Sequence, residues 1–144
     1  MIRTSAPTVG VLCGEGVSGG AVALSATDRL ICLEHAYLCP TSPEAVSAIL
    51  WRSDRHVVKA SKLLRMTAVD LVELGLCTQI IDEGAGAHLF AEQTMARTKE
   101  AACQALDEIV GLAPEVRRHQ RHQRIQCLAS ITRPTSAMPN GVTS

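Results

Sequence analysis

The chain has 144 residues, 47% of them hydrophobic, which is enough for one modest core and favours a single folded domain. Equal numbers of basic and acidic residues give a formal net charge of zero, so we expect neither nucleic acid nor a membrane surface as a partner. Aromatic residues are scarce. The core must therefore be built from Ala, Val, Leu and Ile, which suits helices packed on a sheet.

The sequence carries no targeting or metal-binding signal. No segment near the N-terminus resembles a signal peptide and no apolar run is long enough to span a bilayer, so we expect a cytoplasmic protein. The cysteines are scattered singly, without a C-x-x-C pair or a histidine at metal-ligand spacing. We predict buried or incidental thiols and no metal ion at Cys13, Cys32, Cys39, Cys77, Cys103 and Cys127.

The N-terminal part predicts a βαβ unit. Residues 8–13 are mostly apolar, as in a buried parallel strand, and glycines fill much of residues 14–20. Small residues at 21–26 favour a short helix, and residues 28–34 predict the next strand. This order implies a parallel pair of strands with a right-handed crossover.

Capping signals predict two helices after this unit. Ser42 can cap the first one, because Pro43 suits the first helical position. Ser53 or Asp54 can cap the second, which the apolar spacing extends to residue 65.

A third short helix, a strand and a long helix complete the predicted elements. The third helix begins after Thr67, which forms an approximate capping box with Asp70, and it ends at Gly75. Residues 76–81 predict a strand and residues 89–110 a helix. The expected buried stripe of the long helix is Met95, Ala102, Leu106 and Ile109.

The composition changes after Pro114. Basic residues come first, and then Ser, Thr, Pro, Asn and Gly dominate. We therefore predict a folded domain over residues 1–113 and a basic, disordered tail over residues 114–144.

The glycines between the first strand and the first helix are the strongest functional signal. Glycine lets the main chain approach a ligand closely, and the first N–H groups of a helix have no partner within it. These N–H groups and the positive end of the helix dipole attract negative charge. Residues 14–21 therefore predict a backbone cradle for an anion or an oxyanion.

Two other interpretations of the glycines stay open. Gly14, Gly16 and Gly19 satisfy the dinucleotide-binding pattern G-x-G-x-x-G, and Glu34 stands near where an acid would bind a ribose. Ser18 lies in a short sequence like that of a serine nucleophile, but such a serine needs a histidine base and an acid held by many strands. We expect Ser18 to be the N-cap of the helix instead.

Several separate motifs follow one another along the chain. They are Gly14-Glu15-Gly16, Ser18-Gly19-Gly20-Ala21, Ser42-Pro43-Glu44, Ala48-Ile49-Leu50-Trp51-Arg52, the Leu-x-x-Leu-Gly of residues 71–75, and Gly86-Ala87-His88. With these motifs, the chain from about residue 9 to residue 88 resembles the carboxyltransferase alpha subunit of bacterial acetyl-CoA carboxylase, a member of the crotonase-like superfamily.

The resemblance implies an α/β fold, a partial crotonase-like (ClpP/crotonase) spiral of βαβ units with a long C-terminal helix. It also implies transfer of a carboxyl group from carboxybiotin, held on a biotin carboxyl carrier protein, to acetyl-CoA. The product is malonyl-CoA for fatty acid biosynthesis, so a coenzyme A thioester is a substrate. A beta-type carboxyltransferase subunit is the implied partner in a hetero-oligomer, and no metal ion is expected in this chain.

The resemblance also assigns the site. The backbone amides of Gly19, Gly20 and Ala21 would form the oxyanion hole for the ureido oxygen of biotin. The residues expected to support substrate binding are Gly14, Gly16 and Ser18 and, more weakly, His88.

The chain departs from the family pattern in two respects. Val17 and Ala85 stand where the family usually has glycine. Family members also have a long stretch before the matched region, so we expect only the C-terminal half of the family fold here, with its N-terminal part missing. The chain would then be a separately encoded half, the product of a misplaced start codon, or a non-catalytic remnant or assembly module.

Overall fold

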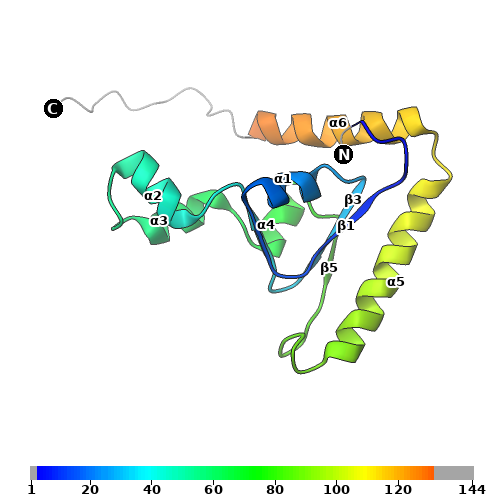
Figure 1. The fold of residues 1–144 in the computed structure, drawn as a ribbon, viewed down its shortest axis with the longest axis horizontal. Coiled ribbons are helices and arrows are strands. Elements are labelled where there is room, and N and C mark those ends of the chain that lie inside the picture. The colour runs from blue at the N-terminus through cyan, green and yellow to red at the C-terminus, as the bar shows by residue number, and fades with distance from the viewer. Residues whose placement is uncertain (1–2, 132–144) are drawn as a thin grey trace.

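The computed structural model describes residues 3–131 of the chain and the side chains of residues 3–126 (Figure 1). The elements in chain order are β1 (Val9–Leu12), β2 (Glu15–Val17), α1 (Ser18–Ser25), β3 (Arg29–Leu33), β4 (Tyr37–Cys39), α2 (Pro43–Trp51), α3 (Val57–Leu64), α4 (Ala68–Glu73), β5 (Gln79–Ile81), α5 (Ala91–Val110) and α6 (Pro114–Ile131).

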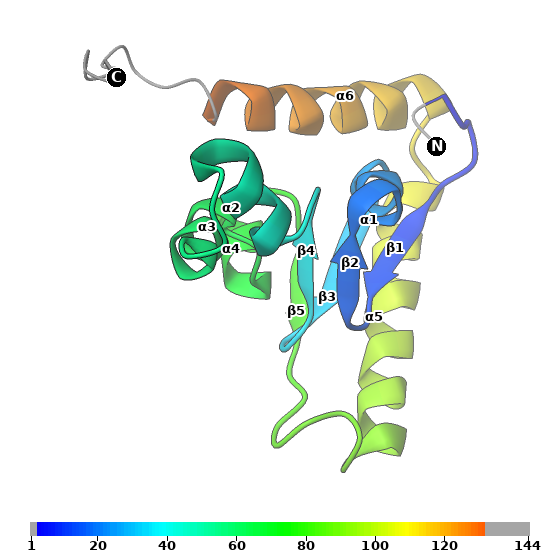
Figure 2. The same cartoon turned by 60° about the vertical axis from the view of Figure 1, so that its left-hand side comes forward.

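Two small parallel sheets form the centre of the molecule. The larger has the strand order β1-β3-β5, and the smaller consists of β2 and β4. In the larger sheet Val9 lies opposite Arg29, and Ile31 lies opposite Gln79. Helix α5 packs along this sheet, whereas α1 contacts β1, β2 and β4 (Figure 2). The predicted parallel pair of residues 8–13 and 28–34 is confirmed in β1 and β3, but the sequence did not predict β2 or β4.

The core is aliphatic, as the composition predicts. Leu30 and Ile31 in β3 are fully buried, and Leu71 of α4 packs in the same cluster. Helix α5 contributes Ala101 and Ala105 to this cluster. Because these side chains are small, the long helix can lie close to the sheet.

The buried stripe of α5 differs from the predicted one. Ile109 is buried as expected, but Met95 and Leu106 are 63% and 41% exposed. Their neighbours Thr94 and Ala105 are buried instead. The prediction placed the large apolar residues against the sheet. Because α5 lies close to the sheet, the helix face that carries mainly small residues is buried instead.

Two of the predicted helix caps are confirmed. The Ser42 hydroxyl accepts a hydrogen bond from the Ala45 N–H at 3.2 Å, with proline in the first turn of α2. At the start of α4, the Thr67 hydroxyl accepts from the Asp70 N–H at 3.3 Å, and the Asp70 carboxylate accepts from the Thr67 N–H at 3.2 Å. Hydrogen bonding from the Thr67 hydroxyl also holds the pKa of Asp70 below its ordinary value.

The predicted cap of α3 is wrong. The N-cap of this helix is His56, and it makes no side-chain cap hydrogen bond. Ser53 instead accepts from the Arg55 N–H within the preceding turn, at 3.2 Å. The buried Ser47 hydroxyl accepts from the His56 N–H at 3.2 Å, so a contact from α2 replaces the expected local cap.

Replacing Thr67 with alanine is expected to lower the free energy of unfolding by about 1 kcal/mol, because the variant loses the hydroxyl that accepts from the Asp70 N–H and donates to the Asp70 carboxylate, while the backbone N–H of residue 67 remains. The lowered pKa of Asp70 means that its stabilising effect is present above its unfolded pKa and is lost as the pH falls through the folded one. The difference between wild type and variant in urea unfolding should therefore shrink in acid. Ser61→Ala is the control, since the Ser61 hydroxyl bonds only to the Val58 carbonyl of its own helix. Equal loss in both variants would contradict the prediction.

The predicted tail over residues 114–144 is wrong in its first part, because residues 114–131 form α6. The remainder, residues 132–144, lies outside the described residues. Arg117, Arg121 and Arg124 are spaced i, i+4 and i+7 and so share one face of the helix. Arg117 and Arg121 are 4% and 1% exposed. The composition predicted that these arginines would be exposed to solvent. In the structure they instead contact backbone carbonyls and the Asp28 carboxylate.

Candidate active site

Strand β2 divides the glycine segment into two parts. After β1 the chain turns at Gly14, whose carbonyl accepts a hydrogen bond from the Tyr37 N–H at 3.1 Å. Glu15–Val17 then forms β2, and α1 begins only at Ser18. Three strand residues extend about 10 Å, so Gly14 does not share a turn with Gly19. The dinucleotide pattern requires its glycines to join one strand directly to one helix, and this geometry does not support it.

Gly16 is required by packing between strands. It is buried in β2, and a Cβ atom there would lie 2.8 Å from the Leu12 side chain and 3.4 Å from the Tyr37 carbonyl oxygen. The absence of a side chain at Gly16 therefore lets β2 lie close to its neighbours.

The prediction that Ser18 is the N-cap of α1 is wrong. The N-cap is Val17, which makes no side-chain cap hydrogen bond. Ser18 is the first residue of the helix and has a φ of +63°, in the left-handed region that favours glycine. Such a conformation costs a non-glycine residue about 1 kcal/mol, and strained residues of this kind cluster at functional sites.

Gly19 and Gly20 are exposed at the start of α1, and nothing inside the described chain explains why they are glycine. Neither has a positive φ, and apart from the adjacent residues and the backbone of the helix itself, no atom lies within 4 Å of where a Cβ would stand at either position. Their N–H groups precede the first i to i−4 bond of the helix, so they are available to an outside acceptor. No acidic side chain occupies the first turn to compete for them.

Ala21 has a different position from the two glycines. It is 1% exposed, and its side chain belongs to the hydrophobic core. Its N–H is the first in the helix with a helical acceptor, the carbonyl of the N-cap residue Val17. Of the three residues expected to donate, Gly19 and Gly20 are therefore exposed, whereas the Ala21 side chain is packed in the core.

The structure does not bring His88 to the glycines. The loop of residues 82–90 follows β5 and lies at the end of the sheet far from α1 in both views (Figures 1 and 2). The exposed His88 ring lies against Gly86, where a Cβ would stand 2.8 Å from the imidazole Cε1. Gly86 has a φ of +123°. His88 therefore packs within its own loop, against Gly86.

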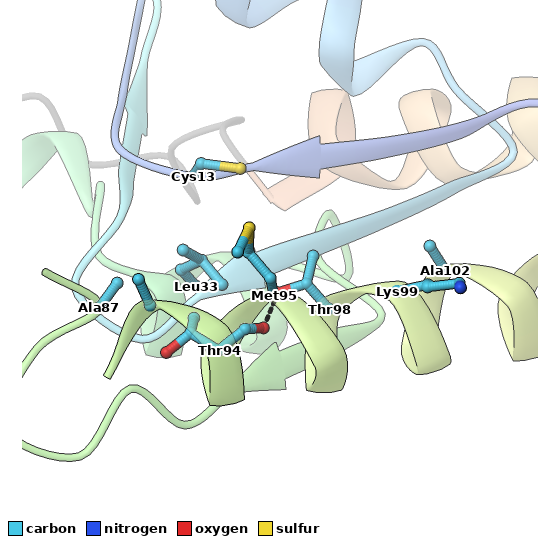
Figure 3. A pocket seen from close by; sticks show the side chains of 9 residues that line it. Cys13, Leu33, Ala87, Thr94, Met95, Thr98, Lys99 and Ala102 are labelled. Atoms are coloured by element: carbon cyan, nitrogen blue, oxygen red, sulfur yellow. Dashed lines mark hydrogen bonds between the residues drawn. The ribbon is translucent and has the colours of Figure 1, made fainter. Parts of the chain in front are cut away.

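A pocket lies near that loop, where strands β1 and β3 end. It is an apolar pocket of about 490 Å³, lined among others by Cys13 after β1, Leu33 of β3 and Ala87 (Figure 3). Met95 and Lys99 of α5 form part of its other wall. The sequence analysis missed this pocket, because residues from three distant segments line it and no local motif marks it.

The described cysteines are free thiols, and three of them, Cys32, Cys39 and Cys77, are buried. A hydrogen bond with Cys77, together with burial, raises the pKa of Cys32, and the same hydrogen bond lowers the pKa of Cys77 to about 7. Within the described residues, no three His, Cys, Asp or Glu side chains gather where they could hold a metal ion. None of the helices in that part of the chain combines the length and apolar character needed to cross a membrane.

Comparison with curated proteins finds relatives that share one name. The chain is 38% identical over 135 residues to the acetyl-coenzyme A carboxylase carboxyl transferase subunit alpha of Thermus thermophilus. It is 41% identical over 119 residues to the protein of the same name from a Bradyrhizobium species. These alignments cover 93% and 82% of this chain but 43% and 37% of the relatives. The chain thus spans about two fifths of the length of the curated relatives it matches.

Comparison with solved structures identifies the fold. One chain of a Pseudomonas malonate decarboxylase hetero-tetramer in complex with coenzyme A matches with a TM-score of 0.62 and 21% identity, over 87% of this chain and 49% of that one. An enoyl-CoA hydratase from Mycobacterium avium matches with a TM-score of 0.51 and 17% identity, over 92% and 53%. The predicted partial crotonase-like α/β fold is confirmed.

The family can also be assigned over almost the whole length of the chain. The sequence model of the family described as acetyl co-enzyme A carboxylase carboxyltransferase-like matches residues 1–129, which include both the glycine segment and most of α6. The chain therefore belongs to the acetyl-CoA carboxylase carboxyltransferase-like family.

Proposed function

We propose that this chain is the carboxyltransferase component of an acetyl-CoA or acyl-CoA carboxylase. The reaction moves a carboxyl group from carboxybiotin on a carrier protein to acetyl-CoA and gives malonyl-CoA for fatty acid biosynthesis. Family membership and the names of the curated relatives support the reaction class. Because the chain spans less than half of those relatives, the activity is proposed for a complex and not for this chain alone.

The observation that carries the proposal is the exposed glycine pair at the start of α1. Gly19 and Gly20 offer two N–H groups without helical partners, and the space beside both residues is open. A side chain at either position would occupy the space from which a ligand oxygen must approach. These residues therefore suit an oxyanion, which backbone donors stabilise well because they are already oriented when charge appears.

Biotin supplies the carboxyl group when its carboxylated form is delivered, and negative charge develops on its ureido oxygen as that group leaves. The Gly19 and Gly20 N–H groups would donate to this oxygen, and the positive end of α1 would add to the attraction. Ser18 holds the start of the helix in a strained conformation, and Ala21 fixes it to the core. Gly16 sets the approach of β2, so the donors rest on rigid elements.

The proposed partners are a beta-type carboxyltransferase subunit and a biotin carboxyl carrier protein, acting together in the cytoplasm as a hetero-oligomer. Helices α2 and α3 pack mainly on each other and carry apolar side chains that are 59–72% exposed, namely Ile49, Leu50, Val58 and Leu63. Exposed apolar groups of this size commonly mark protein interfaces. They support assembly with another chain.

The reverse reaction tests the proposal directly. We expect this chain, mixed with a purified beta-type subunit, to carboxylate a free biotin derivative at the expense of malonyl-CoA, and the chain alone to be much less active. The control is the beta-type subunit by itself. No carboxylation by a mixture shown to form a complex would refute the proposed catalysis and favour a non-catalytic assembly module.

A further inference from the structure

Helix α1 contacts the core with one face only. Among its eight residues only Ala21 is buried, and Val22 on the next position is 61% exposed. Leu24 is partly buried and packs against the same core, so the sheets hold one face of α1, and its carboxyl end depends on further contacts. The direction of α1 matters because the N–H groups of Gly19 and Gly20 point along the helix axis.

Arg124 of α6 holds the opposite end of α1. Its guanidinium donates to the Ser25 carbonyl at 3.0 Å and to the Asp28 carbonyl at 3.1 Å, and it also donates to the Thr27 carbonyl. The last carbonyls of a helix lack helical donors and carry its negative dipole end. One rigid cation thus satisfies three carbonyls at and just after the end of α1.

Helix α6, which lies above α1 in both views, is itself fixed to the body of the molecule (Figures 1 and 2). The Arg121 guanidinium lies 3.0 Å from the Asp28 carboxylate, and both side chains are almost fully buried. The other oxygen of Asp28 accepts from the Thr8 N–H at 2.8 Å and from its hydroxyl at 2.9 Å. Arg117 donates to the Ile109 carbonyl at 3.1 Å. Arg124 therefore lies on a helix that is itself held in place by Arg121 and Arg117.

We infer that Arg124 is a positioning residue for the glycine site, because it fixes the carboxyl end of α1 and thereby sets the direction of the Gly19 and Gly20 N–H groups. Eight helical residues extend about 12 Å, so holding the two ends of such a rod determines its orientation. The strained Ser18 and the buried Ala21 define the front end. At the rear, Arg124 acts together with the buried Thr27, whose hydroxyl donates to the Leu24 carbonyl at 2.7 Å. The catalytic meaning of this role rests on the proposed function, but the positioning itself does not.

Nuclear magnetic resonance of the full chain labelled with ¹⁵N tests the positioning. In Arg124→Gln we expect the helical amides of Val22 and Ser25 to exchange with solvent about tenfold faster, and the amide shifts of Gly19 and Gly20 to move. The amides of Ile31 in the core strand should stay within about twofold of wild type. Arg124→Lys keeps the charge and should recover part of the loss.

Arg118→Gln is the matched control for this experiment. It removes the same charge from the same helix, but Arg118 is exposed and bonds only to Glu115, at 3.0 Å. It should leave α1 unchanged. Unaltered α1 exchange in Arg124→Gln, or an equal increase in the core strand, would overturn the inference.

The malonyl-CoA assay with the partner subunit tests whether the position of α1 matters for catalysis. Its outcome can be distinguished from a failure of the proposed function. We expect Arg124→Gln to lower kcat about tenfold with little change in the KM for malonyl-CoA, and Arg124→Lys to restore part of it. An inactive wild-type mixture would refute the proposed function, while the resonance experiment would still decide the positioning. Full activity of Arg124→Gln despite a loosened α1 would refute the catalytic meaning of the role.

Discussion

Replacing Gly20 with proline is expected to lower carboxyl transfer by the chain and its partner subunit on the order of 100-fold to 1,000-fold, the usual effect of removing one oxyanion-hole donor. Proline has no N–H to donate. It is tolerated in the first turn of a helix, where that N–H makes no helical bond in any case. Circular dichroism should therefore show a folded protein, and the reverse reaction with malonyl-CoA should report the loss.

Two alanine variants sharpen this experiment. Gly20→Ala keeps the N–H but places a methyl group where the ligand must approach, so we expect an intermediate loss. Gly111→Ala also adds a methyl group to open space, but at the far end of α5, and should leave transfer unchanged. Full activity of a folded Gly20→Pro protein would refute the role assigned to the Gly20 amide.

Replacing Arg121 with leucine is expected to lower the free energy of unfolding by about 3 to 5 kcal/mol, the largest stability effect that the structure predicts. The substitution leaves the Asp28 carboxylate buried without its cation. Because whole domains are stable by only about 5 to 15 kcal/mol, much of the chain should unfold at moderate urea concentrations. Urea unfolding followed by circular dichroism measures the effect.

The double variant Asp28→Asn with Arg121→Leu tests the cause of this loss. It removes the uncompensated charge, so it should be more stable than Arg121→Leu alone. Arg118→Leu on the exposed face of α6 should change stability by less than about 0.5 kcal/mol. A loss below about 1 kcal/mol in Arg121→Leu would show that the buried pair does not hold α6 in place.

Local signals in the sequence predicted several elements correctly. The apolar runs around Val9 and Ile31 were predicted to be parallel strands, and they pair as β1 and β3. Ser42 and Thr67 were predicted to cap helices, and their hydroxyl groups do so. These features depend on side chains and backbone groups a few residues apart. For the same reason, the glycine cluster that we propose as a backbone site could be recognised before any fold was known.

Features that depend on distant segments were missed or misassigned. Strand β2 exists because Glu15–Val17 pairs with β4, and this pairing separates Gly14 from the helix start. Within α1, the burial of Ala21 and the left-handed conformation of Ser18 were not predicted either. No local pattern encodes any of these, since each depends on what lies across the sheet or in the core.

The sequence by itself determined the class of core, the parallel β1 and β3 pair and the family resemblance, because all of these follow from composition, local spacing or motif order. Only the tertiary structure decided that residues 114–131 form a helix docked by its arginines. The physical reason is that an arginine side chain is normally exposed to water. It is buried only where folding brings hydrogen-bond acceptors or a carboxylate around its guanidinium. Asp28 and the carbonyls at the end of α1 are nearly a hundred residues away in the chain and come together only in the fold.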